Sequence, residues 1–310
     1  MNSFGDKWTF TSFGESHGAA IGGVLDGVPA GLRIDLGMIR KELERRAGKG
    51  LIGTSPRSKN EPDEVEWLSG VIEIKNEELK IKNLVTLGTP IGFIIRNKDA
   101  RPEDYEWLKH TYRVGHADKV YEQKYGIRDW RGGGRASARE TAARVVAGCI
   151  AKQELAQKGI EIHAELIQVG AETNPEKFAE TIAAYQREGD SIGGIIDCRI
   201  KGLPAGVGEP IFNKLQAELA FAIMSINACK GFEYGTGFGG VTQPGSAINA
   251  ISGGIAGGIS DGTEIVFRCV FKPTPSTPKA GVKGRHDACV ATRAVPIVEA
   301  MTALTLVQLI

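Results

Sequence analysis

Three consecutive glycines and three arginines stand together between Arg131 and Thr141, just before an expected helix. Glycines let the backbone approach a ligand closely, and a helix N-terminus offers N–H groups that have no partner in the helix. Guanidinium groups bind phosphate or carboxylate oxygens two at a time. The segment therefore predicts a cradle for an anion. A flexible surface turn is the alternative, because the spacing matches neither a Walker loop nor a Rossmann fingerprint.

Two glycine-flanked turns contain histidines that are candidates for acid–base chemistry. The turn Gly14–Gly18 follows an apolar strand, where it would expose the side chains of Ser16 and His17. Because these two residues are adjacent, we expect their side chains to point in different directions, which favours a proton donor over a nucleophile pair. A second such turn contains Arg113 and His116. Ordinary surface histidines are the alternative at both places.

A third polar cluster, Lys283–Asp287, precedes an apolar helix predicted over Thr292–Leu309. Taken by itself, this cluster favours a helix-capping aspartate at Asp287 with solvated basic neighbours. A proton-transfer role for the carboxylate is the competing interpretation.

Composition limits the classes of function. The chain has 310 residues and a formal charge of +1, so no global attraction to nucleic acid or to an acidic membrane is expected. The five cysteines contain no C-x-x-C pair, which indicates reduced, buried thiols in a cytoplasmic protein rather than a metal site or a disulfide framework. The apolar stretch 294–310 is shorter than a membrane span and predicts a buried terminal helix.

The elements that would position these clusters mix strands and helices without strict alternation. Strands are predicted over Lys7–Ser12, Gly22–Asp26, Val65–Glu73, Gly92–Arg96, Ile160–Val169, Ile192–Ile200 and Thr263–Lys272. Further helices are predicted over Leu36–Arg46 behind Asp35, Ala138–Lys158, Pro175–Arg187 behind Asn174, and Phe212–Asn227. No linker is apparent, so residues 1–310 are expected to form a single α+β domain.

A short internal repeat suggests two similar halves. The segment Ile21–Asp26, followed by Pro29–Leu32, recurs as Ile192–Asp197, followed by Pro204–Val207, and each copy leads into a predicted helix. We interpret this as two strand–loop–helix halves that share one core, with chance similarity as the alternative.

These clusters together resemble the chorismate synthase family. The carrying segments, in the order of the family, are Gly14–Gly18, Gly115–Asp118, Arg135–Thr141 and Arg285–Asp287. Supporting matches are Glu122–Gly126 with Arg128 and Asp129, Ser225–Ala228 with Lys230 and Gly231, Gly253, Gly254, Gly257 and Gly258, and Lys272–Thr274. The resemblance extends from about Phe10 to Ala300.

The resemblance implies a fold and an activity. The implied fold is a β-α-β sandwich with helices between two antiparallel sheets and pseudo-twofold halves, usually assembled as a homotetramer. The implied activity is a lyase that removes phosphate from 5-enolpyruvylshikimate 3-phosphate by anti-1,4-elimination to give chorismate. Reduced FMN is required without net redox change, since the cofactor lends electron density to the allylic system. NADPH and an external reductant are both candidate electron sources.

The same resemblance implies roles for individual residues, and it implies no metal. His17, with Ser16 beside it, resembles the acid for the departing phosphate, His116 the residue that adjusts flavin protonation, and Asp287 the carboxylate that takes a proton from flavin N5. The implied FMN contacts are Arg135, Ala136, Ser137, Asn227, Ala228, Gly257, Lys272, Pro273, Thr274, Pro275, Ser276 and Arg285. The candidates for the substrate's phosphate and carboxylates are Arg46, Arg113, Arg139, Arg57 and Lys49.

The chain also departs from the family pattern. It is shorter than usual, with losses expected at 237–249 and 275–283, and shortened loops near a site can change access or assembly. An inactive, loop-shortened paralogue that binds phosphate ligands is therefore one alternative. A flavin-dependent NAD(P)H reductase is another. All three catalytic candidates are retained, which favours an active enzyme.

Overall fold

Two of the helices start at the residues that the sequence predicts, each behind a side chain that caps its N-terminus. The computed structural model describes residues 1–55, 57, 60–76, 81–247, 252–282 and 286–310. Helix α1 (Leu36–Ala47) follows Asp35, whose carboxylate accepts hydrogen bonds from two N–H groups of the first turn. Helix α5 (Pro175–Arg187) follows Asn174, whose side-chain oxygen accepts one. Such caps satisfy donors that the helix itself leaves unpaired.

The first large sheet comes from the N-terminal part of the chain and is antiparallel throughout. Its strands lie in the order β1 (Ser3–Phe4), β2 (Thr9–Phe13), β3 (Ala20–Asp26), β8 (Ile91–Arg96) and β5 (Val65–Trp67). In the register, Phe10 lies opposite Leu25, and Ile21 lies opposite Ile95. All four side chains are buried, so one face of this sheet forms part of the core.

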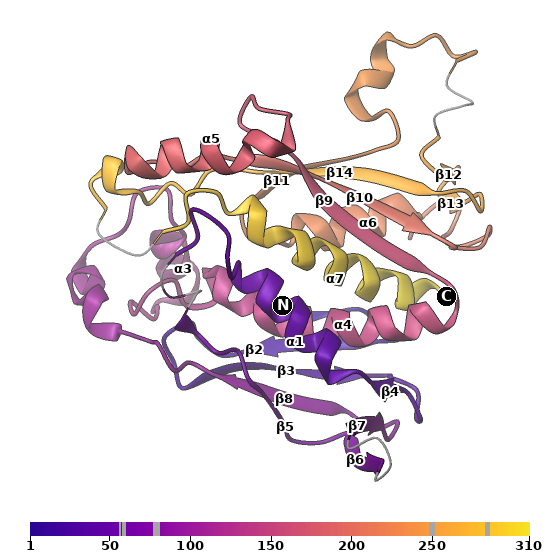
Figure 1. Cartoon of the computed structure of the whole chain (residues 1–310), viewed down its shortest axis with the longest axis horizontal. Helices are drawn as coiled ribbons and strands as arrows, with labels where there is room; N and C mark the ends of the chain where they lie inside the picture. The colour runs from indigo at the N-terminus through magenta and orange to yellow at the C-terminus, as the bar shows by residue number, and fades with distance from the viewer. Residues whose placement is uncertain (56, 58–59, 77–80, 248–251, 283–285) are drawn as a thin grey trace.

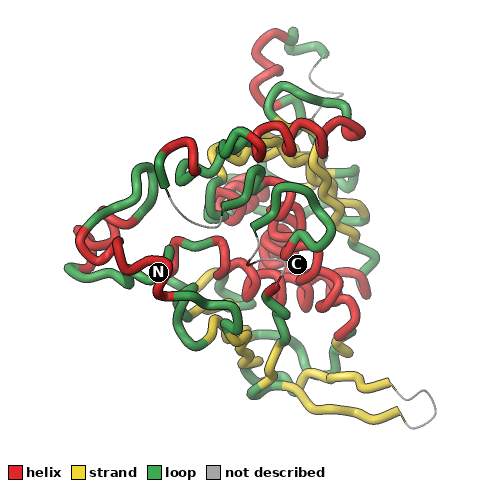
Figure 2. Tube along the Cα trace, turned by 60° about the vertical axis from the view of Figure 1, so that its left-hand side comes forward, coloured by secondary structure: helices red, strands yellow, loops and turns green. Residues whose placement is uncertain are grey.

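The second large sheet comes from the C-terminal half and is also antiparallel. Its order is β11 (Cys229–Tyr234), β14 (Ile265–Phe271), β10 (Gly194–Lys201) and β9 (Glu161–Val169). Two smaller sheets contain β4 (Arg33–Ile34), β7 (Ile81–Thr86) and β6 (Val71–Asn76), and β12 (Ile255–Ala256) with β13 (Ile259–Ser260). Figure 2 shows the β6–β7 hairpin projecting from the body of the molecule.

A layer of helices separates the two large sheets. Figure 1 shows α1, α4 (Thr141–Gln157) and α7 (Ala291–Leu309) between them, while α6 (Leu215–Met224) packs against α7 and β11. Helices α4 and α7 cross closely, since a Cβ on Gly148 would lie 2.3 Å from the Cβ of Ala300. The buried helices provide apolar residues to both sheets, which explains why α4 and α7 are apolar on nearly all sides.

Both copies of the internal repeat lie on inner strands. Ile21–Asp26 is part of β3, and most of Ile192–Asp197 is part of β10. The first copy continues through β4 into α1, and the second continues through a loop into α6. The mixed α/β architecture with antiparallel sheets is therefore as predicted. A twofold relation between the halves stays a prediction.

Several element boundaries differ from the predicted ones. The strand expected over Val65–Glu73 is divided into β5 and β6, because the chain turns at Gly70 with a φ of +76°. The helix expected from Ala138 begins at Thr141, after a 3-10 turn over Ala138–Glu140. Helix α3 (Asp118–Tyr125) and strand β11 were not predicted.

The C-terminal apolar stretch is buried in the core as α7, as its composition predicts. All five cysteines are buried free thiols, which also agrees with the prediction. Among the helices of the described residues, none has the length and apolarity that crossing a lipid bilayer requires.

Candidate active site

Most of the predicted site residues meet at one end of the helical layer, in a cavity of about 440 Å³. Helix α1 ends there at Ala47, while α4 and α7 begin there. Helix N-termini carry partial positive charge, so two of the three helices favour an anion in the cavity. The lining residues are His17, Arg46, Ser55, Arg57, Glu61, Tyr105, Arg113, Gly115, His116, Ala117, Gly133, Ala136, Ser137, Ala138, Arg139, Asn227, Ala228, Lys272, Pro273, Thr274, Pro275, Ser276, His286, Asp287, Val290 and Arg293.

The glycine-rich segment reaches this cavity, but not as the start of an α-helix. It passes through two 3-10 turns, Gly134–Ala136 and Ala138–Glu140, before α4 begins. Gly132 has a φ of +72°, and a Cβ there would lie 2.4 Å from Nδ1 of His17. A glycine is therefore required at this position for the close approach of His17 as well as for the backbone conformation.

His17 is buried, contrary to the exposed turn predicted from the sequence. Ser16 and His17 are only 1% and 6% exposed. The Ser16 hydroxyl lies 3.1 Å from Nδ1 of His17, so the expectation that the two side chains diverge is wrong. The alternation of directions applies to extended strands, and these residues are in a turn. Arg57 and the ring of Tyr105 also contact the imidazole, with Nη1 of Arg57 3.3 Å from Nε2.

The second histidine is held in a compact charged cluster. Nδ1 of His116 lies 2.8 Å from Oδ1 of Asp118, and the guanidinium of Arg113 contacts the same carboxylate through Nε and Nη2. Burial by itself would raise the pKa of Asp118, but the hydrogen bonds from Arg113 and His116 outweigh it and hold that pKa well below its usual range. Asp118 therefore stays ionised beside both residues.

Asp287 does not cap α7. Its Oδ1 accepts a 2.8 Å hydrogen bond from the backbone N–H of Ser55, and its Oδ2 accepts a 2.6 Å bond from Nη1 of Arg293. The residue that precedes α7 is Val290, whose side chain forms no capping hydrogen bond. The helix-capping interpretation is therefore wrong, because the carboxylate joins the loop around Ser55 to the first turns of α7.

Two arginines proposed for the substrate share one buried carboxylate. Arg46 and Arg139 both form ion pairs with Asp63. Nη1 of Arg46 lies 3.2 Å from Oδ2 of Asp63. Burial and the neighbouring Arg293 cation lower the pKa of Arg46 to about 9, so it remains a cation at neutral pH. Asp63 has a φ of +50°, a left-handed conformation that aspartate adopts more readily than most residues.

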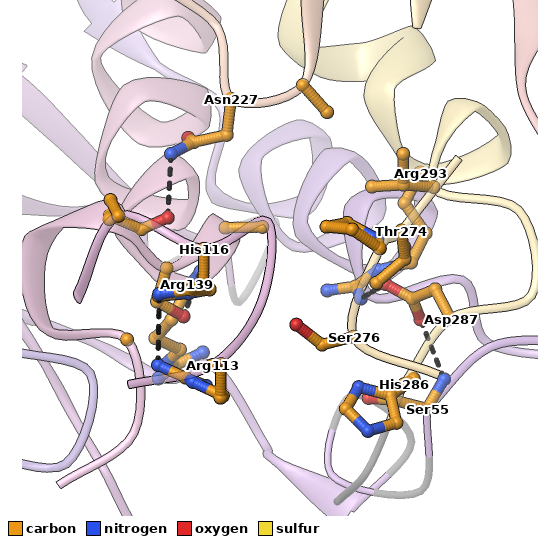
Figure 3. Close-up of a pocket in the computed structure, with 18 of the residues that line it drawn as sticks. Ser55, Arg113, His116, Arg139, Asn227, Thr274, Ser276, His286, Asp287 and Arg293 are labelled. Carbon is orange, nitrogen blue, oxygen red and sulfur yellow. Dashed lines mark hydrogen bonds and ion pairs between the residues drawn. The ribbon is translucent and has the colours of Figure 1, made fainter. Parts of the chain in front are cut away.

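The segments proposed for the cofactor also line the pocket, where Figure 3 shows Asn227 on the side of His116, and Thr274 and Ser276 on the side of Asp287. Asn227 donates to the carbonyl of Ala136 over 3.1 Å, and Ala228 has a strained φ of +68°. Within the part of the chain that the structure describes, three buried side-chain atoms near the pocket have no hydrogen-bond partner. They are Oδ1 of Asn227, Oγ of Ser276 and Nε2 of His286. Buried polar atoms usually have hydrogen-bond partners, and a polar ligand in the pocket would supply them.

Four of the proposed residues that the structure describes do not line this cavity. Ser16 lies behind His17, and Arg135 lines a neighbouring cavity and donates to Ser12 and Gly14. Gly257 lies in the β12–β13 turn, and Lys49 pairs with Glu44 on the surface. Arg285 lies outside the described residues.

The structure adds residues that the sequence interpretation missed: Ser55, Glu61, Asp63, Tyr105, Asp118, His286 and Arg293. His286 was visible next to Asp287, and Asp118 was visible in the Gly115–Asp118 segment. The others had no sequence signal, since acidic residues and an arginine at a helix start are common on solvated surfaces.

Comparison with known proteins gives a consistent result. The family profile for chorismate synthase matches residues 8–310. The chain is 47% identical to the chorismate synthase of Phocaeicola vulgatus, covering 99% of this chain and 97% of that protein. It is also 47% identical to that of Christiangramia forsetii, covering 98% and 96%. A solved structure, a crystal structure of chorismate synthase, superposes with a TM-score of 0.75 at 28% identity, over 99% of this chain and 92% of the other.

Proposed function

The chain belongs to the chorismate synthase family, and on that premise we propose that the pocket between the N-termini of α4 and α7 is its active site. The protein is a lyase that converts 5-enolpyruvylshikimate 3-phosphate to chorismate in the shikimate pathway of aromatic amino acid biosynthesis. The observation that carries the proposal is that His17, His116 and Asp287, which are far apart in sequence, line one arginine-rich cavity.

The charges of the pocket suit the substrate. The substrate carries a phosphate and carboxylates, and the lining includes Arg46, Arg57, Arg113, Arg139 and Arg293. Guanidinium forks bind such oxygens with defined geometry, so they would orient the ring as well as attract it. Two carboxylates hold three of these arginines in place. Glu61 pairs with Arg57, and Asp63 pairs with both Arg46 and Arg139.

The family uses reduced FMN, and the pocket fits it. When bound, this cofactor lends electron density to the allylic system as phosphate departs and recovers it as the ring hydrogen leaves. Asn227, Ser276 and His286 each offer an unpartnered polar atom, judged among the described residues. The residues that would hold the cofactor are Ala136, Ser137, Asn227, Ala228 and Lys272–Ser276.

Proton transfer is assigned to His17, His116 and Asp287, which all line the pocket. We assign His17 as the acid at the departing phosphate, because Arg57 beside it would hold that anion against the imidazole. With the cofactor bound, His116 would hold or supply a proton beside it, and Asp287 would accept one. Arg293 and Ser55 fix the Asp287 carboxylate at the pocket wall.

An anaerobic assay tests this proposal. Protein, substrate and FMN are combined with and without dithionite, and chorismate and free phosphate are measured. We expect equal amounts of both products with reduced FMN and neither with oxidised FMN. Chorismate formed at full rate without flavin would contradict the cofactor assignment. Tight substrate binding without turnover would support the paralogue interpretation, and stoichiometric consumption of NAD(P)H would support the reductase interpretation.

Four further points are proposals of the same kind. NADPH is a candidate reductant for the FMN. Residues 1–310 act as one domain around a single hydrophobic cluster. The protein works in the cytoplasm, where its five free thiols stay reduced.

The chain assembles as a homotetramer. Exposed Phe221, Phe238 and Val241 support an apolar contact surface, and light scattering tests the assembly.

A further inference from the structure

Asp118 is the first residue of α3, and both oxygens of its buried carboxylate accept several hydrogen bonds. Oδ2 accepts from the backbone N–H of Arg113 over 3.1 Å and from its Nε over 2.9 Å. Oδ1 lies 2.8 Å from Nη2 of Arg113 and 2.8 Å from Nδ1 of His116. One carboxylate therefore binds both an arginine and a histidine of the proposed site.

The position of the proton on His116 follows from the hydrogens of Arg113. Nη2 of Arg113 lies 3.1 Å from Nδ1 of His116, so at first sight it could donate to that nitrogen. However, this Nη2 has two hydrogens, and two closer acceptors are present, Oδ1 of Asp118 at 2.8 Å and the carbonyl of Gly132 at 2.9 Å. Arg113 can therefore offer His116 only a hydrogen that an oxygen also accepts, whereas Nδ1 of His116 lies 2.8 Å from Oδ1 of the Asp118 carboxylate, which has no hydrogen to donate. Nδ1 must therefore carry a proton of its own and donate it to Asp118.

The opposite edge of the imidazole, which carries Nε2, lies beside Gly133, and both residues line the pocket and also the neighbouring cavity around Arg135. A Cβ on Gly133, which lines the pocket, would lie 3.3 Å from Nε2 of His116. The glycine therefore places no side chain of its own against Nε2. A histidine that donates from Nδ1 to a carboxylate has its Nε2 lone pair in a fixed direction for proton exchange.

We propose that Asp118 is a positioning residue that holds His116 in the Nδ1–H tautomer and directs its Nε2 lone pair into the pocket. Nε2 can then take one proton from a ligand and return it, while Asp118 stays ionised and balances the positive charge on the ring. The proposal about the tautomer stands on this geometry alone. Its consequence for turnover rests on the proposed function.

A purely structural role is the competing explanation. Asp118 stands at the N-terminus of α3, where any carboxylate interacts favourably with the helix dipole. Such a role would affect stability and would not set the tautomer of His116. Asp129 provides a matched control, because it binds the Nε and backbone N–H of Arg131 in the same manner without contacting His116.

The test combines a spectrum and a rate. Long-range ¹H–¹⁵N spectra at about pH 8, where an ordinary imidazole is neutral, report which ring nitrogen carries the proton, and His116→Ala assigns the signal. In the wild type we expect Nδ1 to be protonated. In Asp118→Asn, the amide N–H₂ facing His116 should move the proton to Nε2, and anaerobic single turnover with reduced FMN should fall by about 10²- to 10⁴-fold. Asp129→Asn should change neither the tautomer of His116 nor the single-turnover rate.

A wild-type spectrum in which Nδ1 lacks a proton would overturn the proposal, even if Asp118→Asn fails to fold. An unchanged tautomer or an unchanged rate in folded Asp118→Asn would also overturn it. The double variant with both Asp118→Asn and His116→Ala should have nearly the same single-turnover rate as His116→Ala alone, since the two residues act as a unit. If the wild type forms no chorismate, the proposed function fails, while the spectrum still decides the tautomer.

Discussion

Side chains in the pocket hold one another through ion pairs and hydrogen bonds. Asp287 binds Arg293, Asp118 binds Arg113, and Asp63 binds Arg46. Each pair is largely shielded from water, so its geometry is better defined than that of a surface pair. Groups that are held in place lose less entropy when they orient a substrate.

His17→Ala should lower turnover by about 10²- to 10⁴-fold, because it removes the proposed acid at the leaving phosphate. FMN binding, followed by fluorescence, should remain close to that of the wild type. His163→Ala, at an exposed position on β9, is the control and should have no effect on rate. Normal turnover in folded His17→Ala would return this residue to a packing role against Tyr105.

Asp287→Asn should lower single turnover by at least about a hundredfold, since an amide cannot accept a proton at neutral pH. It also loses the ion pair with Arg293, and we expect a loss of about 3–5 kcal/mol in the free energy of unfolding. Arg293→Gln should lose similar stability, but at saturating substrate it should lose much less of the single-turnover rate, because the carboxylate remains. Equal losses of rate in the two variants would show that the ion pair, and not proton transfer, accounts for the effect.

The elements are held together most tightly where α4 crosses α7. Gly148 lies at this crossing, and the backbone and Cβ of Ala300 occupy the space next to it. Two small residues at the crossing let the helices approach closely. The N-termini that line the pocket are therefore fixed relative to one another by this contact far from the chemistry.

Gly148→Ala should destabilise the protein by about 1–3 kcal/mol, since the added methyl would lie 2.3 Å from the Cβ of Ala300. Helix propensity alone would change stability in the opposite direction by about 1 kcal/mol, so the sign of the melting-temperature shift separates the two effects. Gly239→Ala is the control, because a Cβ there meets no atom of the described residues within 4 Å. A higher melting temperature for Gly148→Ala would refute the close crossing.

At the scale of the whole molecule, one buried carboxylate connects the helical layer to the second sheet. Glu299 of α7 is 1% exposed. It accepts from Arg45 of α1, from Lys152 of α4 and from the backbone N–H of Ala164 in β9. Burial tends to raise the pKa of Glu299, but the hydrogen bond from Arg45 and the charge of Lys152 outweigh it, so that this pKa lies below its ordinary value.

Acid should therefore weaken the fold through Glu299. Because its pKa is lower in the folded chain than in the unfolded chain, its contribution is complete above the unfolded pKa and is lost as the pH falls through the folded pKa. Glu299→Gln should lose about 3–5 kcal/mol at pH 7, and denaturation curves of variant and wild type should converge at acid pH. Glu66→Gln, in an exposed pair with Arg96, should behave like the wild type at both pH values. A constant difference at all pH values would contradict the linkage.

The sequence alone determined the features that depend on neighbouring residues. Asp35 and Asn174 mark the starts of α1 and α5, because a capping hydrogen bond spans only two or three residues. Long apolar runs identified α4 and α7, since burial requires apolar side chains wherever the partners lie. The motif segments also identified the family and most residues of the pocket.

Tertiary structure alone decided what depends on residues that are distant in the chain. Asp287 contacts Ser55 and Arg293, Asp63 joins Arg46 to Arg139, and Lys49 lies on the surface with Glu44. A carboxylate has the same local pattern whether it caps a helix, binds an arginine or faces water. Its role is set by the groups that the fold brings within hydrogen-bond distance, and those groups leave no periodic or neighbouring signal in the sequence.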